Sequence, residues 1–491
     1  MVTMINRLQR LLRPAEPAQR EAGFSIIEVM VAMMVFAVMS VGIAYGIANT
    51  LQLTQTSRGR ETAVALASQD IDMLRQTAAA STTGIFDVVS ARGDDNTSTI
   101  GGMTYRVDRK VSWVQSDGAS GACGTSNGKL AYKSVVETVS WPNPRGGSSS
   151  TSVTSAIAPS DAVTDPGYGT IIISVADASG APYPGVSISV TPVGGGTGSA
   201  LTKSPLPTDA QGCSYAVNVV QGDYTVTANT PGGIDTDQQQ PSKQSPISVT
   251  AGASAPVPFV YDQASTMRFQ YAPTYNATVP TNMVTTLSSS VGGLDPVSPW
   301  DTTSKTLQIT STTNPSPSAA VFPLTSGYTV LAGPYSNSLD GTKNCLSPSP
   351  ASWTTPNPTG DVGVGTAVVP APAGDTADAP VMMGVATVKG VKGRYLTAVS
   401  SSAPGPGDPG CAAGMTMRFP VAGADVATIA LPFGTWIISS GTTFGSTTKN
   451  EIASNASNVA PVTNGSVNRK TALVVISYDN TLTLDPRGQI R

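Results

Sequence analysis

A single carboxylate, Glu28, stands near the start of a long apolar run and is the first candidate for chemistry. The run, GFSIIEVMVAMMVFAVMSVGIAYGIA, covers residues 23–48, and no charged side chain occurs from Val29 to Ser57. About twenty apolar residues in a helix span the roughly 30 Å hydrocarbon core of a bilayer, where a helix satisfies its own backbone. An ionised group is costly there unless it has a partner, so we expect Glu28 to have a function.

The composition argues against an enzyme. The 491 residues contain no histidine, and Glu137 and Glu451 are the only glutamates beyond residue 61. Without histidine the chain lacks Ser-His-Asp and Cys-His nucleophile activation and the commonest zinc ligand. We find no paired carboxylates, so we expect no catalytic residues and no cofactor, and an exported hydrolase is disfavoured. The net charge is −3 and the sequence has no basic runs, so it shows no sign of a surface that binds nucleic acid.

Three weaker motifs are predicted to be ordinary loops. The glycine-rich segment 193–198 lacks the Gly-Lys-Ser/Thr and the helix that a phosphate-binding loop needs. The tripeptide Arg-Gly-Asp at 92–94 is expected to lie in a solvated loop. The pairs Asp94-Asp95 and Asp375 with Asp378 lack the spaced acidic pattern of a calcium loop, so we expect no metal site.

Four widely spaced cysteines are the remaining reactive groups. They are Cys123, Cys213, Cys345 and Cys411, and no two form a CxxC pair of the kind found in zinc and thioredoxin-type sites. An even number in an exported chain permits disulfides with three connectivities. We expect a disulfide between Cys345 and Cys411, and leave the other two either buried singly or paired.

The N-terminal run resembles type IV prepilins and the pseudopilins of type II secretion. In that family a short basic leader ends in glycine, phenylalanine usually follows, and a glutamate is the fifth residue of the mature chain. Here these positions are Gly23, Phe24 and Glu28, and the resemblance covers about the first 75 residues. It implies that prepilin peptidase cleaves between Gly23 and Phe24 and that Phe24 is N-methylated. It also implies that Glu28 pairs with the N-terminal amine of a neighbouring pilin subunit in a filament.

Two other interpretations of the same residues remain open. The run could be a secretory signal cleaved after Ala48, or an uncleaved signal anchor. A secretory signal would not need Glu28 inside its apolar region. The basic excess in residues 1–22 places the leader in the cytoplasm and the C-terminal region outside. We therefore expect a single-pass cell membrane protein before assembly, then a location in the pilus or at the cell surface.

The apolar run is predicted to be the first half of one long helix. No proline occurs between Pro17 and Pro142, and beyond Ser57 the apolar residues recur with helical spacing. Following the leader at 1–23, we expect a helix over 24–78 that spans the membrane in 24–50. Its second half would bury the face formed by Val64, Ala67, Ile71 and Leu74.

Strand patterns dominate the rest of the chain. Charged residues are only 12%, too few for many amphipathic surface helices, whereas threonine, valine and turn residues are frequent. Residues 103–113 alternate with apolar side chains at odd positions, interrupted only by Arg109, and 135–141 form a second strand. The expected fold class is an α+β pilin-like N-terminus, with a long helix and a small antiparallel sheet, followed by all-β sandwich modules.

Residues 79–160 are expected to form a pilin-like head, followed by a sandwich at 167–262. The second module resembles carboxypeptidase-regulatory-like (transthyretin-like) domains through Pro184-Gly185-Val186, a Thr-Asp turn at 208–212 and a final Gly-x-Tyr strand at 222–224. Related adhesin repeats can form a Lys–Asn isopeptide bond from a lysine in the first strand. Residues 170–176 contain no lysine, so no such cross-link is predicted.

The C-terminal half divides less clearly. We expect a β-rich region of uncertain fold over 263–365 and a second β-sandwich-like domain over 375–491, which includes a strand at 472–478. The tetrapeptide Thr-Met-Arg-Phe occurs at 266–269 and again at 416–419. This repetition suggests related strands, with chance similarity as the alternative.

Together these features predict a minor pilin or pseudopilin. Such a subunit would belong to a type IV pilus or a type II secretion-like filament, with prepilin peptidase, other pilin subunits and the membrane as partners. The β modules would present a surface for an extracellular ligand and function in adhesion. The alternative is a membrane-anchored surface adhesin that is not assembled into a filament.

Overall fold

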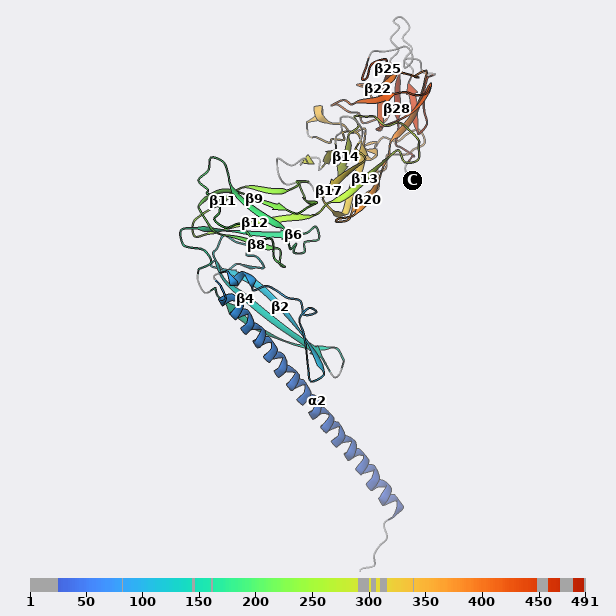
Figure 1. Cartoon of the computed structure of the whole chain (residues 1–491). Helices are drawn as coiled ribbons and strands as arrows, with labels where there is room; N and C mark the ends of the chain where they lie inside the picture. The colour runs from blue at the N-terminus through green and yellow to red at the C-terminus, as the bar shows by residue number, and fades with distance from the viewer. Residues whose placement is uncertain are drawn as a thin grey trace, which may run out of the picture. The chain divides into compact units, whose positions relative to one another are not determined.

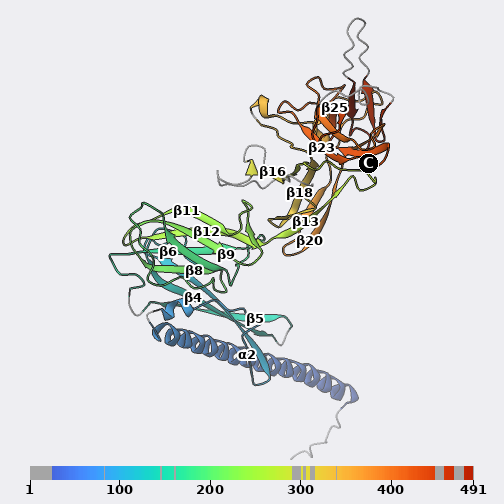
Figure 2. The same cartoon turned by 45° about the horizontal axis from the view of Figure 1, so that its top comes forward.

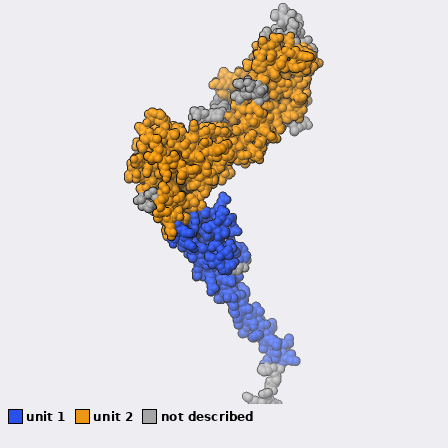
Figure 3. Space-filling view, in the orientation of Figure 1, with its two compact units in different colours: residues 1–73, 91–110, 136–155 blue, residues 74–90, 111–135, 156–491 orange. Residues whose placement is uncertain are grey.

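The computed structural model describes most of the chain beyond the leader. The described residues are 25–81, 83–143, 146–159, 162–289, 300–301, 306–309, 316–338, 340–447, 458–468 and 480–489. One long helix is followed by many short strands (Figure 1). The predicted fold class is thereby confirmed. The chain forms two compact units, 1–73 with 91–110 and 136–155, and the remainder (Figure 3).

The helix α2 runs over Ile26–Ala79 without interruption. Ser25 caps its start, because the Ser25 hydroxyl accepts a hydrogen bond from the Ile27 N–H at 3.3 Å. The first half is exposed except for the half-buried Asn49 and Gln52, whereas the second half buries one stripe of mostly small residues. This stripe comprises Gly59, Ala63, Ala67, Asp70, Ile71, Leu74 and Ala78.

The buried stripe corrects the predicted face at one position. Val64 is exposed, and the smaller Ala63 faces inward instead. Ala63 and Ala67 lie in a core with Tyr105, Val139 and Trp141. Small side chains let the sheet approach the helix closely, because a methyl group added at Gly59 would lie 2.8 Å from Nε1 of Trp141.

The head sheet has the strand order β1-β2-β4-β5, with β3 beside β2. Its strands are β1 (Thr97–Ile100), β2 (Met103–Gln115), β3 (Ser120–Gly121), β4 (Leu130–Pro142) and β5 (Ser148–Ile157). In β2 and β4 the odd-numbered residues are mostly buried and the even-numbered ones mostly exposed or half-buried, which matches the alternation predicted for β2. Arg109 keeps the inward parity of β2, so it is not the interruption that its charge suggested.

Arg109 faces inward because two carboxylates accept hydrogen bonds from its guanidinium group. Its Nη2 donates to Oδ1 and Oδ2 of Asp70 on α2, both at 2.6 Å, and its Nε donates to Oε1 of Glu137 on β4 at 3.0 Å. Asp70 is 5% exposed and Glu137 is fully buried. One guanidinium balances one carboxylate, so the second carboxyl favours its protonated form. Burial, together with the neighbouring Asp70, raises the pKa of Glu137 to about 8 despite Arg109.

Residues 169–263 form a two-sheet sandwich (Figure 2). One sheet has the order β10-β12-β6-β8 and the other β11-β9-β7, and both contribute to one core. Strands β6 and β12 pair in parallel, and every other strand pairing described in this module is antiparallel. The strands are β6 (Gly169–Ala176), β7 (Ser187–Pro192), β8 (Cys213–Val219), β9 (Gly222–Asn229), β10 (Gly233–Asp235), β11 (Ser242–Val249) and β12 (Ser254–Gln263).

The C-terminal region shares one large core between residues 267 and 484. Its sheets are β17-β13-β20, β15-β16-β14-β18-β19, β24-β21-β26 and β23-β22-β25-β28-β27. Residues on both sides of position 365 contribute to this core, and β13 pairs in parallel with β20 across it. The predicted strand at 472–478 lies outside the described residues.

The bounds of these strands follow the chain. They are β13 (Ser265–Tyr271), β14 (Thr285–Ser288), β15 (Trp300–Asp301), β16 (Thr306–Ile309), β17 (Ser318–Val321), β18 (Leu324–Ala332), β19 (Val368–Ala371), β20 (Thr376–Val381), β21 (Gly384–Lys389), β22 (Tyr395–Ser400), β23 (Thr416–Val421), β24 (Val426–Leu431), β25 (Gly434–Gly441), β26 (Val459–Pro461), β27 (Gly465–Asn468) and β28 (Thr481–Leu484). The two Thr-Met-Arg-Phe segments lie in β13 and β23, and in both the methionine and phenylalanine are buried while the arginine is exposed.

Replacing Gly59 tests the close approach of helix and sheet. We expect Gly59→Ala to lower the free energy of unfolding by about 1 to 3 kcal/mol, because the new methyl group overlaps the Trp141 ring in a packed core. Thermal unfolding of the full chain in detergent, followed by tryptophan fluorescence, measures the change. Gly46→Ala on the same helix is the control, since a methyl group there meets nothing within 4 Å. Equal melting temperatures for the two variants would contradict the proposed contact.

Replacing Glu137 tests the buried ion pair. The folded state holds a proton on Glu137 that the unfolded state releases above its ordinary pKa of 4.5. Stability should therefore fall as pH rises from about 5 to about 8, by at most about 1.4 kcal/mol per pH unit. We expect Glu137→Gln to flatten this slope, because the amide is neutral and can still accept from Arg109.

Denaturant unfolding of the full chain at several pH values measures this slope. Glu61→Gln, which replaces an exposed carboxylate on α2, should leave the slope unchanged. If Glu137→Gln retained the wild-type slope, another group would be responsible for it.

Candidate functional site

Glu28 is the third residue of α2, in its first turn. The backbone N–H groups of Glu28 and Val29 both donate to the carbonyl of Ser25, at 2.9 and 3.1 Å. The Glu28 side chain is exposed. Gly23 and Phe24, the predicted processing residues, lie outside the described residues.

The start of α2 supplies a local reason for a carboxylate at this position. Ser25 and Glu28 have the Ser-x-x-Glu spacing of a capping box, directly before an apolar run. The positive end of the helix dipole favours a negative charge in the first turn. The sequence analysis missed this pattern, although the spacing alone would have revealed it. Helix initiation thus accounts for part of the role of Glu28, independently of any neighbouring subunit.

The first half of α2 presents an uncovered apolar surface. Large apolar side chains from Ile26 to Leu53 are exposed on all sides of the helix. It is the one helix in the described part of the chain that is long and apolar enough to cross a membrane, with a mean hydropathy of 2.4 in its most apolar window. Full burial of each such side chain is worth about 1.5–3 kcal/mol, which favours cover of this surface by lipid or by other helices.

The polar groups at the end of the apolar segment are satisfied within the helix. The Thr50 hydroxyl donates to the Gly46 carbonyl at 2.9 Å, and the Thr54 hydroxyl donates to the Thr50 carbonyl at 2.8 Å. Such bonds let threonine enter an apolar environment without an unpaired hydroxyl.

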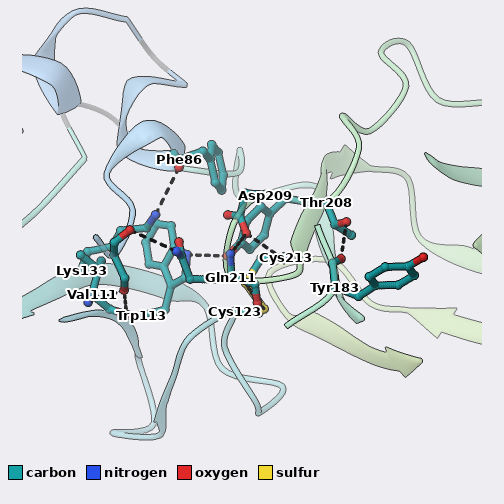
Figure 4. Close-up of a disulfide and its surroundings, with 12 residues drawn as sticks. Phe86, Val111, Trp113, Cys123, Lys133, Tyr183, Thr208, Asp209, Gln211 and Cys213 are labelled. Carbon is teal, nitrogen blue, oxygen red and sulfur yellow. Dashed lines mark hydrogen bonds between the residues drawn. A yellow bond between two sulfur atoms is a disulfide. The ribbon is translucent and has the colours of Figure 1, made fainter. Parts of the chain in front are cut away.

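Beyond the helix, a second cluster joins the head to the sandwich (Figure 4). A disulfide connects Cys123, in the loop after β3, with Cys213 at the start of β8. Nε1 of Trp113 donates to the Tyr215 hydroxyl at 2.9 Å. The ring centroids of Phe86 and Tyr215 lie 4.6 Å apart. These residues belong to, or pack against, one core with the end of α2, so the head and the sandwich are not independent here.

Lys133 is buried in this junction. Its amine donates to the carbonyl of Val88 at 2.8 Å and lies 5.0 Å from the centre of the Trp113 ring. Burial lowers the pKa of Lys133 to about 8, against the attraction of Asp209 and Asp87. Burial also raises the pKa of Asp209, although the backbone N–H groups of Cys213 and Gln211 stabilise its charged form. The amine is thus held by backbone carbonyls and an aromatic ring.

The other candidate residues are placed as structural groups. Cys345 and Cys411 form a second disulfide, with a Cα–Cα distance of 3.8 Å. Asp94 pairs with Arg106, and Asp378 pairs with Arg268 at 2.8 Å. Within the described ranges no group of three or more Asp, Glu, Cys or His side chains could hold a metal ion.

Comparison with known proteins identifies one motif. Residues 18–44 match the profile described as the prokaryotic N-terminal methylation motif. A search of curated proteins found no match. The matched segment contains Gly23, Phe24 and Glu28 and extends into the exposed apolar part of α2.

Several solved structures show weak likeness to this chain. The Bacillus anthracis TIE protein is 11% identical, over 71% of this chain and 67% of that chain, with a TM-score of 0.17. A streptococcal ancillary pilin is 13% identical over 46% of this chain and 82% of that chain, with a TM-score of 0.18. BcpA, the major pilin subunit of Bacillus cereus, is 12% identical over 32% of this chain and 64% of that chain, with a TM-score of 0.14. Likeness at this level does not bear on function.

The methylation motif and the uncovered apolar helix agree in position. The motif indicates a structural rather than a catalytic protein, processed by prepilin peptidase and assembled with other pilins. Both features are consistent with a membrane-anchored chain that is exported to the cell surface. The chain is type IV pilin-like at its N-terminus, with β-rich modules attached to its long helix.

Proposed function

We propose that the chain is a minor pilin or pseudopilin, a structural subunit of a type IV pilus or a type II secretion-like filament. The observation that carries this proposal is the coincidence of the methylation motif at 18–44 with a helix whose apolar surface is not covered by any of the described residues. Prepilin peptidase cleaves after Gly23, and Phe24 becomes the methylated N-terminus. The helix then moves from lipid into a bundle of like helices.

Glu28 directs this assembly by charge. Cleavage creates an amine at Phe24, next to the positive end of the helix dipole, where a cation is unfavourable. A carboxylate from a neighbouring subunit neutralises that amine, and the amine in turn offsets the cost of burying Glu28. The pairing fixes how far one helix is displaced along the next. Because Glu28 lies in the first turn of its own helix, its backbone position is already set by the Ser25 cap.

The β modules favour a low-copy or tip position. Most of the residues follow the head, and modules of this bulk hinder close repetition along a slim filament. At a tip the modules present a surface to an extracellular ligand, which makes adhesion the accompanying activity.

We infer that the sandwich is a carboxypeptidase-regulatory-like domain, since its motif residues form its turns. Gly185 has a φ of 78°, and the buried Val186 donates its N–H to the Thr208 hydroxyl at 2.9 Å. The Asp209 carboxylate accepts from the N–H of Cys213 at 2.9 Å. Tyr224 is buried, and its hydroxyl donates to the Val220 carbonyl at 2.8 Å. The first strand, β6, has no lysine for an isopeptide bond.

The competing function is a surface adhesin held in the membrane by an uncleaved anchor. The same exposed helix would serve as that anchor, and the sandwich modules would make the contacts. This alternative requires neither cleavage at Gly23 nor a partner for Glu28.

Mass spectrometry of the N-terminal peptide from the native host tests the processing step. We expect the mature chain to begin with N-methylated Phe24, because the peptidase removes the leader. An intact Met1 would support the uncleaved anchor, and a chain beginning at Asn49 would indicate a secretory signal. Either result would exclude the proposed assembly.

Substitution of Glu28 tests the assembly step. We expect the Glu28→Ala variant to insert into the membrane normally but to be largely absent from filaments. Immunoblotting of the membrane fraction and of the sheared filament fraction measures both amounts. Glu61→Ala, an exposed carboxylate on the same helix, should incorporate as the wild type does. Normal incorporation of Glu28→Ala would show that no charge pairing is needed.

A further inference from the structure

A turn at one end of the C-terminal region is rich in basic residues. Strand β21 ends at Lys389 and β22 begins at Tyr395, and the turn between them contains Lys392 and Arg394. Val391 of this turn is fully buried in the core, whereas Lys392 is exposed. The N–H of Arg394 donates to the Val391 carbonyl at 2.9 Å, which closes the turn. The core therefore fixes the backbone that carries these basic side chains.

An exposed aromatic ring and a further arginine lie at the same end. Tyr395 pairs with Gly441 at the end of β25, and its ring centroid lies 5.8 Å from that of Phe444, which is 52% exposed. A methyl group added at Gly445 would lie 3.1 Å from Nε of Arg418 on β23, so this exposed arginine lies beside the loop that carries Phe444. We call this set the basic patch, and its members are Lys389, Lys392, Arg394, Tyr395, Arg418 and Phe444.

The cations of the basic patch have no acidic partner in the described part of the chain. The other basic residues described in the C-terminal region form ion pairs, which are Arg268 with Asp378, Lys343 with Asp340 and Arg487 with Asp485. None of the ion pairs formed by described residues includes a lysine or an arginine of the patch. Like charges gathered without counter-charges raise the local positive potential, so the patch attracts anions.

We propose that the basic patch binds an acidic polysaccharide. The carboxylates of such a polymer pair with the lysine and arginine side chains, and an arginine holds a carboxylate through two parallel hydrogen bonds. The apolar C–H face of a sugar ring packs on the exposed ring of Phe444. This inference rests on the proposed function and deepens it, because it names the class of extracellular ligand for the β modules.

The composition of the patch favours a polysaccharide over a nucleic acid. Single-stranded nucleic acids stack successive bases on several aromatic rings, whereas Phe444 is the large exposed ring of this patch. DNA is also densely charged, and both the net charge of −3 and the exposed Asp425 on the adjoining loop repel such a polymer. A polysaccharide with carboxylates on its sugars combines charge with the apolar ring faces that the patch can contact.

Binding of polygalacturonate and alginate to the full chain in a neutral detergent tests this proposal. Interferometry with immobilised protein measures the dissociation constants at several salt concentrations. We expect both acidic polymers to bind, and the affinity to fall as salt rises, because exposed ion pairs are screened. Fully methyl-esterified polygalacturonate has the same sugars without the charge. It should bind at least about tenfold more weakly, because its charge-assisted hydrogen bonds are lost.

Charge-changing variants locate the site. Lys392→Gln combined with Arg394→Gln should weaken the binding of polygalacturonate by about tenfold or more. Phe444→Ala should weaken it too, because the surface for the sugar ring is removed. Asp425→Asn should strengthen binding, because a charge that repels the ligand is removed. Lys343→Gln is the matched control, since it removes a positive charge outside the patch.

Three results would overturn the proposal. They are absence of binding by both acidic polymers, equal binding of the charged and esterified polymers, and equal affinities of the double variant and Lys343→Gln. Tighter binding of single-stranded DNA than of either polysaccharide would replace the proposed ligand with a nucleic acid. The comparison of charged and esterified polymers uses the wild-type chain, so it holds where a variant fails to fold. None of these measurements depends on cleavage at Gly23 or on filament assembly, so their failure is distinct from failure of the proposed function.

Discussion

The exposed apolar surface on the first half of α2 is the constraint on which the rest of the structure depends. Large side chains from Ile26 to Leu53 are not covered by any of the described residues, and lipid or other helices suit such a surface. A helix committed to that environment cannot also fold back over the head. The second half must therefore hold the head by a different means, on the same continuous helix.

The second half of α2 holds the head through a stripe of small residues and a buried cluster of charged side chains. Gly59, Ala63 and Ala67 let the head strands approach closely, where larger side chains would hold them away. Close packing alone would let the sheet shift along the helix. The bonds from Arg109 to Asp70 and Glu137 fix the position of the sheet along the helix, because a shifted sheet would leave buried charges unpaired.

The sequence was sufficient where one physical rule decided the outcome. The absence of proline and the helical spacing of apolar residues predicted one helix over 24–78, close to the observed Ile26–Ala79. Alternation predicted the inward face of β2, and residues 135–141 were predicted as a strand. Spacing alone could not choose between Ala63 and Val64, because that choice depends on how closely Trp141 approaches.

Pairings between distant residues were beyond the sequence. Arg109 and Glu137 occupy odd-numbered positions, which face inward in β2 and β4, although charged side chains usually lie at the surface. Their burial is explained by the ion pairs of Arg109 with Asp70 and Glu137, which the sequence does not reveal. The bond between Cys123 and Cys213 has no signature in spacing, since it depends on how the head and sandwich pack. For the processing residues Gly23 and Phe24 the sequence motif remains the argument, because they lie outside the described residues.

The contacts between the head and the sandwich also decide whether these two parts are separate domains. Between them, residues 159–169 are polar and contain proline and glycine, a composition typical of a linker between separate domains. The disulfide, the bond from Trp113 to Tyr215 and the shared core bypass that connection. A connection that is bypassed needs no stiffness of its own, so its irregular sequence is tolerated. A motion of the sandwich relative to the end of α2 must then disrupt a buried core rather than bend a linker.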